Sequence, residues 1–157
     1  NVLGKTVLPD ANRSLRFTYG NVEGYQPRDA VFYQPQTTLA GVIAKHSGAE
    51  PFDVPEKLSE LANSRDYGRW IDRELNDVPV AFLSSCDITG GNSGSPVLNA
   101  RGELVGCAFD GNWEALTNDW QYNPALSRAI SVDVLYVLFI LDKYSSADEL
   151  IEELELR

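Results

Sequence analysis

A glycine-rich loop followed by a tight hairpin most strongly limits the folds open to this chain. The loop covers residues 89–94, and apolar strands are expected directly after it at 96–99 and 103–109. The residues between these strands are typical of a turn, because Gly102 can take the positive φ that such turns need. The chain therefore has to contain antiparallel β-structure directly after a loop of small residues.

Short apolar runs separated by turn signals fill most of the remaining chain, and this pattern predicts a mainly β fold with several helices. The length of 157 residues suits one core, so we expect a single domain over residues 1–157. The other expected features are an irregular segment at 1–13, a turn bracketed by Gly20 and Gly24, and a long loop at 111–128. The other expected strands are 14–19, 29–33, 79–83 and 129–131. The expected helices are 55–64, with 65–76 as its continuation, then 132–143, and a last one after the capping box Ser146–Glu149, whereas 37–44 fits either a strand or a helix start.

The overall charge argues against two classes of partner. The net charge is −10 and the pI is about 4.4, so nucleic acid and anionic membranes would both repel the chain. The longest apolar run, residues 134–141, is too short to span a bilayer. The sequence contains no methionine, even at its first position, and we therefore expect a fragment, a processed product or an excised piece of a longer protein.

Two cysteines, Cys86 and Cys107, leave two states open. They could form one disulfide in an oxidising compartment, or they could be free thiols that pack as small apolar side chains. No cofactor and no metal site is expected from the sequence.

Ser93 is the candidate for chemistry, in Gly91-Asn92-Ser93-Gly94-Ser95-Pro96. A nucleophilic serine needs a loop of small residues, because its hydroxyl has to protrude into a cleft without a shielding side chain. The glycines also allow the backbone N–H groups of Gly91 and Ser93 to converge, where they would hold the oxyanion of a tetrahedral intermediate. The alternative is a Gly-Ser-Asn turn with no chemistry.

A serine nucleophile needs a base, which is usually a histidine held by a carboxylate. The single histidine, His46, lies in Ala-Lys-His-Ser-Gly, and we interpret it as a surface loop residue. The catalytic histidine and aspartate are therefore expected outside this chain.

The stretch from Thr89 to Val97 resembles the serine loop of chymotrypsin-like peptidases. The chain as a whole resembles the bacterial S46 peptidases, which are dipeptidyl-peptidases of the type 7 and type 11 kind. The segments that carry this resemblance are Asn92–Gly106, Phe109–Glu114, Pro9–Asn12, Phe17–Gly20, Tyr25–Ala30, Ser127–Asp133 and Leu141–Lys143. They cover nearly the whole chain and correspond to the C-terminal part of the family.

The resemblance implies a fold and an activity. Enzymes of this family remove dipeptides from the N-termini of oligopeptides, are dimeric, and are periplasmic or otherwise secreted by bacteria. Their peptidase domain is a double β-barrel with an inserted helical lid, and this chain would be its serine-bearing, chymotrypsin-like barrel half. Ser93 falls on the nucleophile of the family, whose histidine and aspartate lie upstream, so the isolated chain is expected to be inactive.

The resemblance also assigns two substrate-binding positions. Asp110 falls on the residue that binds the free α-amino group, with a turn or capping role as the alternative. Gly111 falls on the residue that sets the preference at P1, where an arginine favours acidic side chains because it pairs with their carboxylate. Glycine leaves that pocket open and uncharged, which implies an apolar P1 preference.

Several competing interpretations remain. Asp87 could lie at the base of a trypsin-like pocket, although the family carries an aspartate there regardless of preference, which favours a structural role. Cys86 stands where these peptidases usually have asparagine. A V8-like or HtrA-like endopeptidase shares Gly-Asn-Ser-Gly but lacks the segment Phe109–Glu114, and the chain could also be a non-catalytic folded or dimerisation fragment.

Overall fold

The computed structural model describes residues 15–154 and residue 156. Contacts group the chain into two compact units. The first comprises residues up to Pro35, Leu83–Val97 and Cys107–Ser131, and the second comprises Gln36–Phe82, Leu98–Gly106 and the residues from Val132 onward. The single domain expected over 1–157 stays a prediction, and the expectations for residues 1–13 and the Pro9–Asn12 motif lie outside the described residues.

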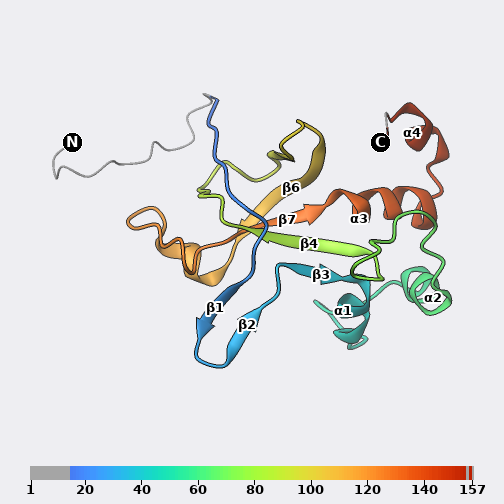
Figure 1. Cartoon of the computed structure of the whole chain (residues 1–157). Coiled ribbons are helices and arrows are strands. Elements are labelled where there is room, and N and C mark those ends of the chain that lie inside the picture. Colours follow the sequence, from blue (N-terminus) through green and yellow to red (C-terminus); the bar gives the residue numbers. More distant parts are fainter. Residues whose placement is uncertain (1–14, 155, 157) are drawn as a thin grey trace. The chain divides into compact units, whose positions relative to one another are not determined.

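The described residues combine two sheets with short helices, as the sequence predicted (Figure 1). A two-stranded antiparallel sheet pairs β1 (Tyr25–Arg28) with β2 (Val31–Tyr33). The second sheet has the order β3-β4-β7-β6-β5, with β3 (Gln36–Thr38), β4 (Pro79–Ser84), β5 (Pro96–Leu98), β6 (Leu104–Gly111) and β7 (Ala129–Asp133). The helices are α1 (Leu39–Ala44), α2 (Glu56–Ser64), α3 (Val134–Phe139) and α4 (Asp148–Glu153), with a 3₁₀ helix η1 (Trp113–Thr117) and a π-helical turn η2 (Ile140–Tyr144).

The predicted hairpin after the glycine-rich loop is confirmed. Its turn closes with Gly102 at φ 78°, and the Asn99 N–H donates to the Glu103 carbonyl at 2.9 Å. The Asn99 side chain strengthens the turn, because its Oδ1 accepts from the N–H groups of Arg101 and Glu103 at 2.9 and 3.1 Å. The sequence alone was sufficient here because every signal is local.

The expected strand 14–19 is wrong for its described part, since residues 15–20 take no regular secondary structure. The turn expected between Gly20 and Gly24 is also wrong, because the turn of this region lies at residues 29–30, where Ala30 has φ 61°. Both glycines instead mark close approaches of backbone. A Cβ on Gly20 would lie 2.7 Å from the Cys86 nitrogen, and one on Gly24 would overlap the Tyr33 carbonyl oxygen.

Three helix expectations are corrected in the second unit. Arg65 takes a left-handed conformation with φ 53°, and this ends α2 instead of continuing it through 65–76. The helix expected at 132–143 begins at Val134, because the Asp133 carboxylate caps it by accepting from the Leu135 N–H at 2.9 Å. The predicted capping box does not form, since Ala147 precedes α4 and Ser146 has φ 53°. The ambiguous segment 37–44 divides into β3 and α1.

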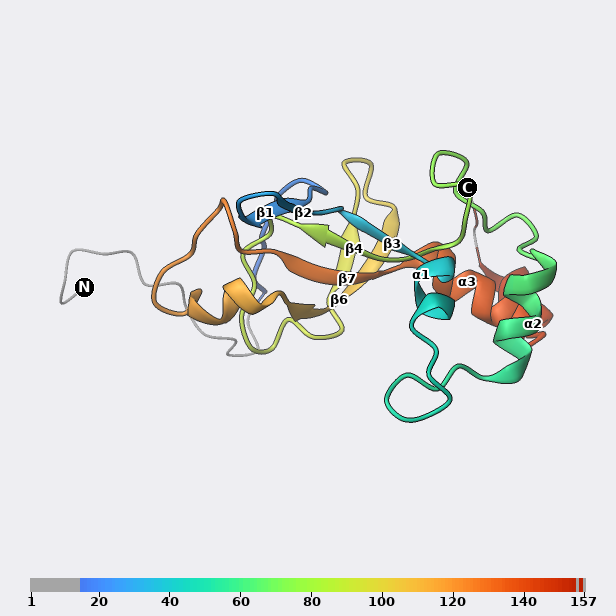
Figure 2. The same cartoon turned by 90° about the horizontal axis from the view of Figure 1, so that it is seen from below.

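The core of the second unit gathers α1, α2 and α3 around a few fully buried side chains (Figure 2). Leu39, Val78 and Phe139 are each 0% exposed. Tyr67 packs edge-on against Phe139 at 6.1 Å between ring centroids. The buried Trp70 satisfies its indole N–H by donating to the Asp142 carboxylate at 2.6 Å.

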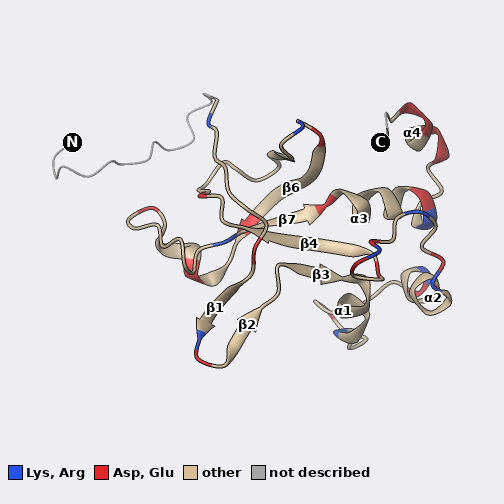
Figure 3. Cartoon of the chain, viewed as in Figure 1, with Lys and Arg blue, Asp and Glu red and all other residues tan. Residues whose placement is uncertain are grey.

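Acidic residues occur along the whole described chain, and α4 is rich in them, with the sequence Asp-Glu-Leu-Ile-Glu-Glu (Figure 3). Within the described range, the helices are too short or too polar to cross a membrane.

We predict that Phe139→Ala lowers the free energy of unfolding by about 3–5 kcal/mol, because it removes a fully buried ring and leaves a cavity. The matched control is Val137→Ala on the same helix, where the side chain is 41% exposed and the loss should stay below about 1 kcal/mol. Urea unfolding followed by tryptophan fluorescence checks both values, and equal losses would contradict this packing.

Candidate active site

The candidate site lies entirely within the first unit, where the serine loop is fastened to strand β6. The Gly94 N–H donates to the Ala108 carbonyl at 2.7 Å, and the Ala108 N–H donates to the Ser95 carbonyl at 2.9 Å. Gly91 and Gly94, on either side of the Asn92-Ser93 pair, have φ of 93° and 86°. Because only glycine takes such φ values without strain, these two positions permit the path that the loop follows.

Ser93 is exposed at the tip of this loop. Its hydroxyl lies 3.5 Å from the Phe109 carbonyl oxygen, at the outer limit of a hydrogen bond. Neither the Gly91 N–H nor the Ser93 N–H donates to another group among the described residues. The hydroxyl and both amides are therefore free to meet a bound molecule.

A pocket of about 250 Å³ adjoins Ser93. Phe109, Asp110 and Gly111 at the end of β6 line it, together with the loop before Ser93 and η1. Asp110 is exposed, and its carboxylate accepts from the Gly111 N–H at 2.8 Å. A Cβ on Gly111 would lie 3.2 Å from the Ala115 Cβ, so this side of the pocket leaves little room near the backbone. The structure thus places Ser93, Asp110 and Gly111 around one cavity.

Two further carboxylates, Asp119 and Asp87, lie in or near the pocket, and only the first lines it. Asp119 lines the pocket and accepts a hydrogen bond from the Thr89 hydroxyl at 2.8 Å. Asp87 does not line it. Its carboxylate lies 3.4 Å from the Asn118 amide, and burial, followed by the charge on Asp119, raises its pKa above the ordinary value. These contacts favour the structural interpretation of Asp87.

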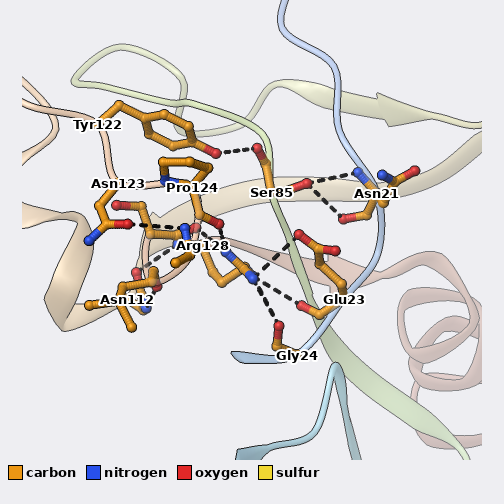
Figure 4. A network of polar contacts seen from close by, with 12 residues as sticks. Asn21, Glu23, Gly24, Ser85, Asn112, Tyr122, Asn123, Pro124 and Arg128 are labelled. Atoms are coloured by element: carbon orange, nitrogen blue, oxygen red, sulfur yellow. Dashed lines mark hydrogen bonds and ion pairs between the residues drawn. The ribbon is translucent and has the colours of Figure 1, made fainter. Parts of the chain in front are cut away.

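A buried arginine organises the backbone that adjoins the pocket-lining residue Asn112 (Figure 4). Arg128 is only 5% exposed, and its guanidinium donates to the carbonyls of Gly24, Pro124 and Ser127 at 2.7–3.2 Å. It also donates to the Glu23 carbonyl at 3.3 Å and pairs with the Glu23 carboxylate at 3.3 Å. One side chain therefore ties the 23–25 segment to the loop after η1.

Asn112 extends this network to the pocket-lining residues (Figure 4). Its Oδ1 accepts from the Arg128 N–H at 2.8 Å, and its Nδ2 donates to the Leu126 carbonyl at 2.8 Å and to the Glu114 carboxylate at 2.9 Å. The Tyr25 hydroxyl donates to the same carboxylate at 2.9 Å. Because Asn112 directly follows Gly111, these bonds hold the end of β6 that bears Asp110 and Gly111.

The single histidine is a surface residue, as predicted. His46 belongs to the second unit, its side chain is 41% exposed, and its Nδ1 already accepts from the Val54 N–H at 2.9 Å. Cys86 and Cys107 are both free thiols, so of the two states left open by the sequence the structure has the unpaired one. No cluster of histidine, cysteine and carboxylate side chains in the described part of the chain could hold a metal ion.

Sequence reasoning missed the residues that support the site. Arg128 and Asn112 occurred only inside motifs that carried a resemblance, with no role given to either. A buried arginine has no local signature, since its partners lie up to 105 positions away in the sequence. Asn112 does have a signal in the sequence. It directly follows Gly111, and asparagine side chains often bond to backbone groups, so a role in holding the backbone could have been predicted.

Comparison with known proteins gives consistent matches. A profile of the peptidase S46 family matches residues 1–156. The chain is 49% identical to an Asp/Glu-specific dipeptidyl-peptidase of Shewanella putrefaciens, over 96% of this chain and 23% of that protein. It is 51% identical to dipeptidyl-peptidase 7 of Phocaeicola vulgatus, over 94% of this chain and 20% of that protein. The crystal structure of Porphyromonas endodontalis DPP11 in complex with the dipeptide Arg-Asp matches with a TM-score of 0.92 and 44% identity, over 99% of this chain and 23% of that one. The chain thus spans less than a quarter of the length of these relatives.

We predict that Arg128→Lys lowers the free energy of unfolding by about 2–4 kcal/mol, because a single ammonium cannot satisfy the carbonyls that the guanidinium fork now reaches. Arg28→Lys on the exposed edge of β1 is the matched control, with a change within about 0.5 kcal/mol. Thermal and urea unfolding measure both, and a harmless Arg128→Lys would show that the network carries little of the stability.

Proposed function

The chain belongs to the peptidase S46 family, and from this premise we propose that it supplies the nucleophile and part of the substrate pocket of a serine dipeptidyl-peptidase. The substrate is an oligopeptide with a free N-terminus. The observation that carries the proposal is the exposed Ser93 hydroxyl on a glycine loop beside a pocket that also holds Asp110. The relatives named above, an Asp/Glu-specific dipeptidyl-peptidase and dipeptidyl-peptidase 7, support the same reaction class.

The chemistry follows from the free groups of the site. The Asp110 carboxylate binds the α-ammonium of the substrate, which places the second peptide carbonyl at Ser93. The Ser93 oxygen attacks this carbonyl while a base takes its proton, and the N–H groups of Gly91 and Ser93 bind the resulting oxyanion. The leaving amine takes the proton as the peptide bond breaks, and water then hydrolyses the acyl-enzyme to release the dipeptide.

The base and its carboxylate partner come from outside this chain in our proposal. His46 is not the base for Ser93 in our proposal. It is a surface residue of the other unit, and its Nδ1 accepts a hydrogen bond from the Val54 N–H. The isolated chain is then inactive. The complete protein is in our proposal a homodimer located in the periplasm or secreted, as the family resemblance implies.

The pocket supports an apolar P1 preference. Gly111 offers no charge to a P1 carboxylate. Among the described residues, the pocket lining includes Asp110 and Asp119 but no lysine or arginine. An acidic P1 side chain would therefore meet like charge from these two carboxylates. The relatives differ in this respect, since one is named as Asp/Glu-specific and the other is named dipeptidyl-peptidase 7, without a stated P1 residue.

Two alternatives are separated by simple observations. A V8-like or HtrA-like endopeptidase would cleave substrates whose N-terminus is blocked, because it does not need the α-ammonium. If the chain is a non-catalytic folded or dimerisation fragment, any peptidase activity of the complete protein would not depend on Ser93.

We predict that the complete protein hydrolyses fluorogenic dipeptide substrates with apolar P1 and that Ser93→Ala lowers kcat by at least about 10⁴-fold. Ser95→Ala is the matched control in the same loop and should keep activity within a few-fold. Acetylation of the substrate N-terminus should abolish cleavage, and unchanged cleavage of acetylated substrates would favour the endopeptidase.

A second prediction concerns Gly111. Gly111→Arg should shift the ratio of kcat/KM for glutamate over leucine at P1 upward by roughly 100-fold, because the guanidinium pairs with the carboxylate. The new side chain has to displace Ala115 by a few tenths of an ångström, so Gly111→Gln serves as the control that adds bulk without charge. Equal ratios for both variants would show that residue 111 does not face P1.

A further inference from the structure

The loop in front of Ser93 contains a β-turn whose central peptide could face either way. The Asn92 N–H donates to the Thr89 carbonyl at 3.2 Å, which closes a turn with Gly90 and Gly91 at its centre. Gly91 has φ 93°, the sign that a type II turn requires at this position. A type I turn differs by a flip of the central peptide, and two adjacent glycines have no side chain that resists such a flip.

The orientation of this central peptide decides whether an oxyanion site exists. A trans peptide is planar, so the Gly90 carbonyl and the Gly91 N–H point to opposite sides of one rigid unit. Whatever fixes the Gly90 carbonyl therefore also aims the Gly91 N–H. A flip would replace a donor with a carbonyl oxygen at the place where negative charge develops.

One side chain from a distant segment holds this peptide. The Arg16 Nη2 atom donates to the Asn92 Oδ1 at 2.9 Å and lies 3.4 Å from the Gly90 carbonyl oxygen. The same Asn92 oxygen accepts from the Thr89 N–H at 3.1 Å, which anchors the turn at its other end. Arg16 lies in segment 15–20, 76 positions before Asn92. The contact that reaches the Gly90 carbonyl therefore comes from outside the loop.

We propose that Arg16 is a positioning residue that holds the Gly90–Gly91 peptide with its N–H directed to the oxyanion site beside Ser93. This inference rests on the proposed function, since it assigns the cause of an active loop geometry. Arg16 contacts the loop through a carbonyl and a carboxamide and takes no part in proton transfer. Segment 15–20 is thereby a structural part of the active site rather than a connector.

The test replaces Arg16 in the complete protein by alanine, glutamine and lysine. Arg16→Ala and Arg16→Gln should lower kcat by roughly 10- to 100-fold with KM within about threefold, because the oxyanion is bound only in the transition state. Arg16→Lys should fall between them and the wild type. Both contacts come from the one Nη2 atom, which an ammonium can replace, but the ammonium is carried on a flexible stem and not in a planar guanidinium. Arg28→Gln, on the exposed β1 strand, is the matched control and should leave kcat unchanged.

Two further readouts separate positioning from a general loss of structure. The inhibition constant of a dipeptide boronic acid, which forms a tetrahedral anion on the serine, should rise by the same factor as kcat falls. Millimolar guanidinium should restore part of the activity of Arg16→Ala and none of the activity of Ser93→Ala. The inference is overturned if Arg16→Ala keeps the wild-type kcat and boronate affinity. It is also overturned if boronate affinity and melting temperature fall together, because that result indicates a general loss of structure.

The wild-type control distinguishes the two levels of the proposal. If the wild-type protein cleaves no dipeptide substrate and does not react with a fluorophosphonate at Ser93, the proposed function itself fails. If the wild-type protein is active and serine-dependent while the Arg16 variants match it, only the role of Arg16 fails.

Discussion

The buried guanidinium of Arg128 is the interaction on which the rest of the candidate site depends. A charge with 5% exposure is costly to desolvate, and the cost is offset only because carbonyl groups and the Glu23 carboxylate surround it. The residues that carry those acceptors, at 23–24, 124 and 127, lie outside the strands. The arginine thus replaces regular secondary structure as the means of holding irregular backbone, and Asn112 carries the same constraint to the end of β6.

This arrangement separates the parts of the site that must be rigid from those that can vary. The backbone of residues 110–112 is fixed from the side of Asn112, whereas Asp110 and Gly111 line the pocket. Substitution at residue 111 can therefore change the charge of the pocket without changing the path of the strand. An Asp/Glu-specific dipeptidyl-peptidase and a dipeptidyl-peptidase 7 are each about half identical to this chain over the segment that aligns with it, which is consistent with specificity residing in a few such positions.

The sequence predicted those features whose signals are local. The hairpin around Gly102 and the surface position of His46 follow from residues close in sequence, whereas the grouping of Ser93 with Asp110 and Gly111 follows from the family resemblance. The errors arise where a distant contact overrides a local pattern. The alternation at 15–19 resembles a strand, yet the segment is held by the side chain of Arg16 and by the close approach at Gly20 rather than by a β-ladder. The end of α2 was also missed, because Arg65 takes the left-handed conformation although it is neither a glycine nor followed by a proline.

The serine loop shows why a motif predicts chemistry better than it predicts geometry. The glycines in Thr89-Gly-Gly-Asn-Ser-Gly permit the turn that the reaction needs, but the same freedom permits the flipped turn. Glycine lowers the strain of the active conformation without selecting it. Selection has to come from contacts outside the motif, and here those contacts are the β6 backbone at Ala108 and the Arg16 guanidinium. A serine loop of this composition is consequently only as well ordered as the segments that dock against it, which is why an extended stretch with no secondary structure of its own can matter to the chemistry.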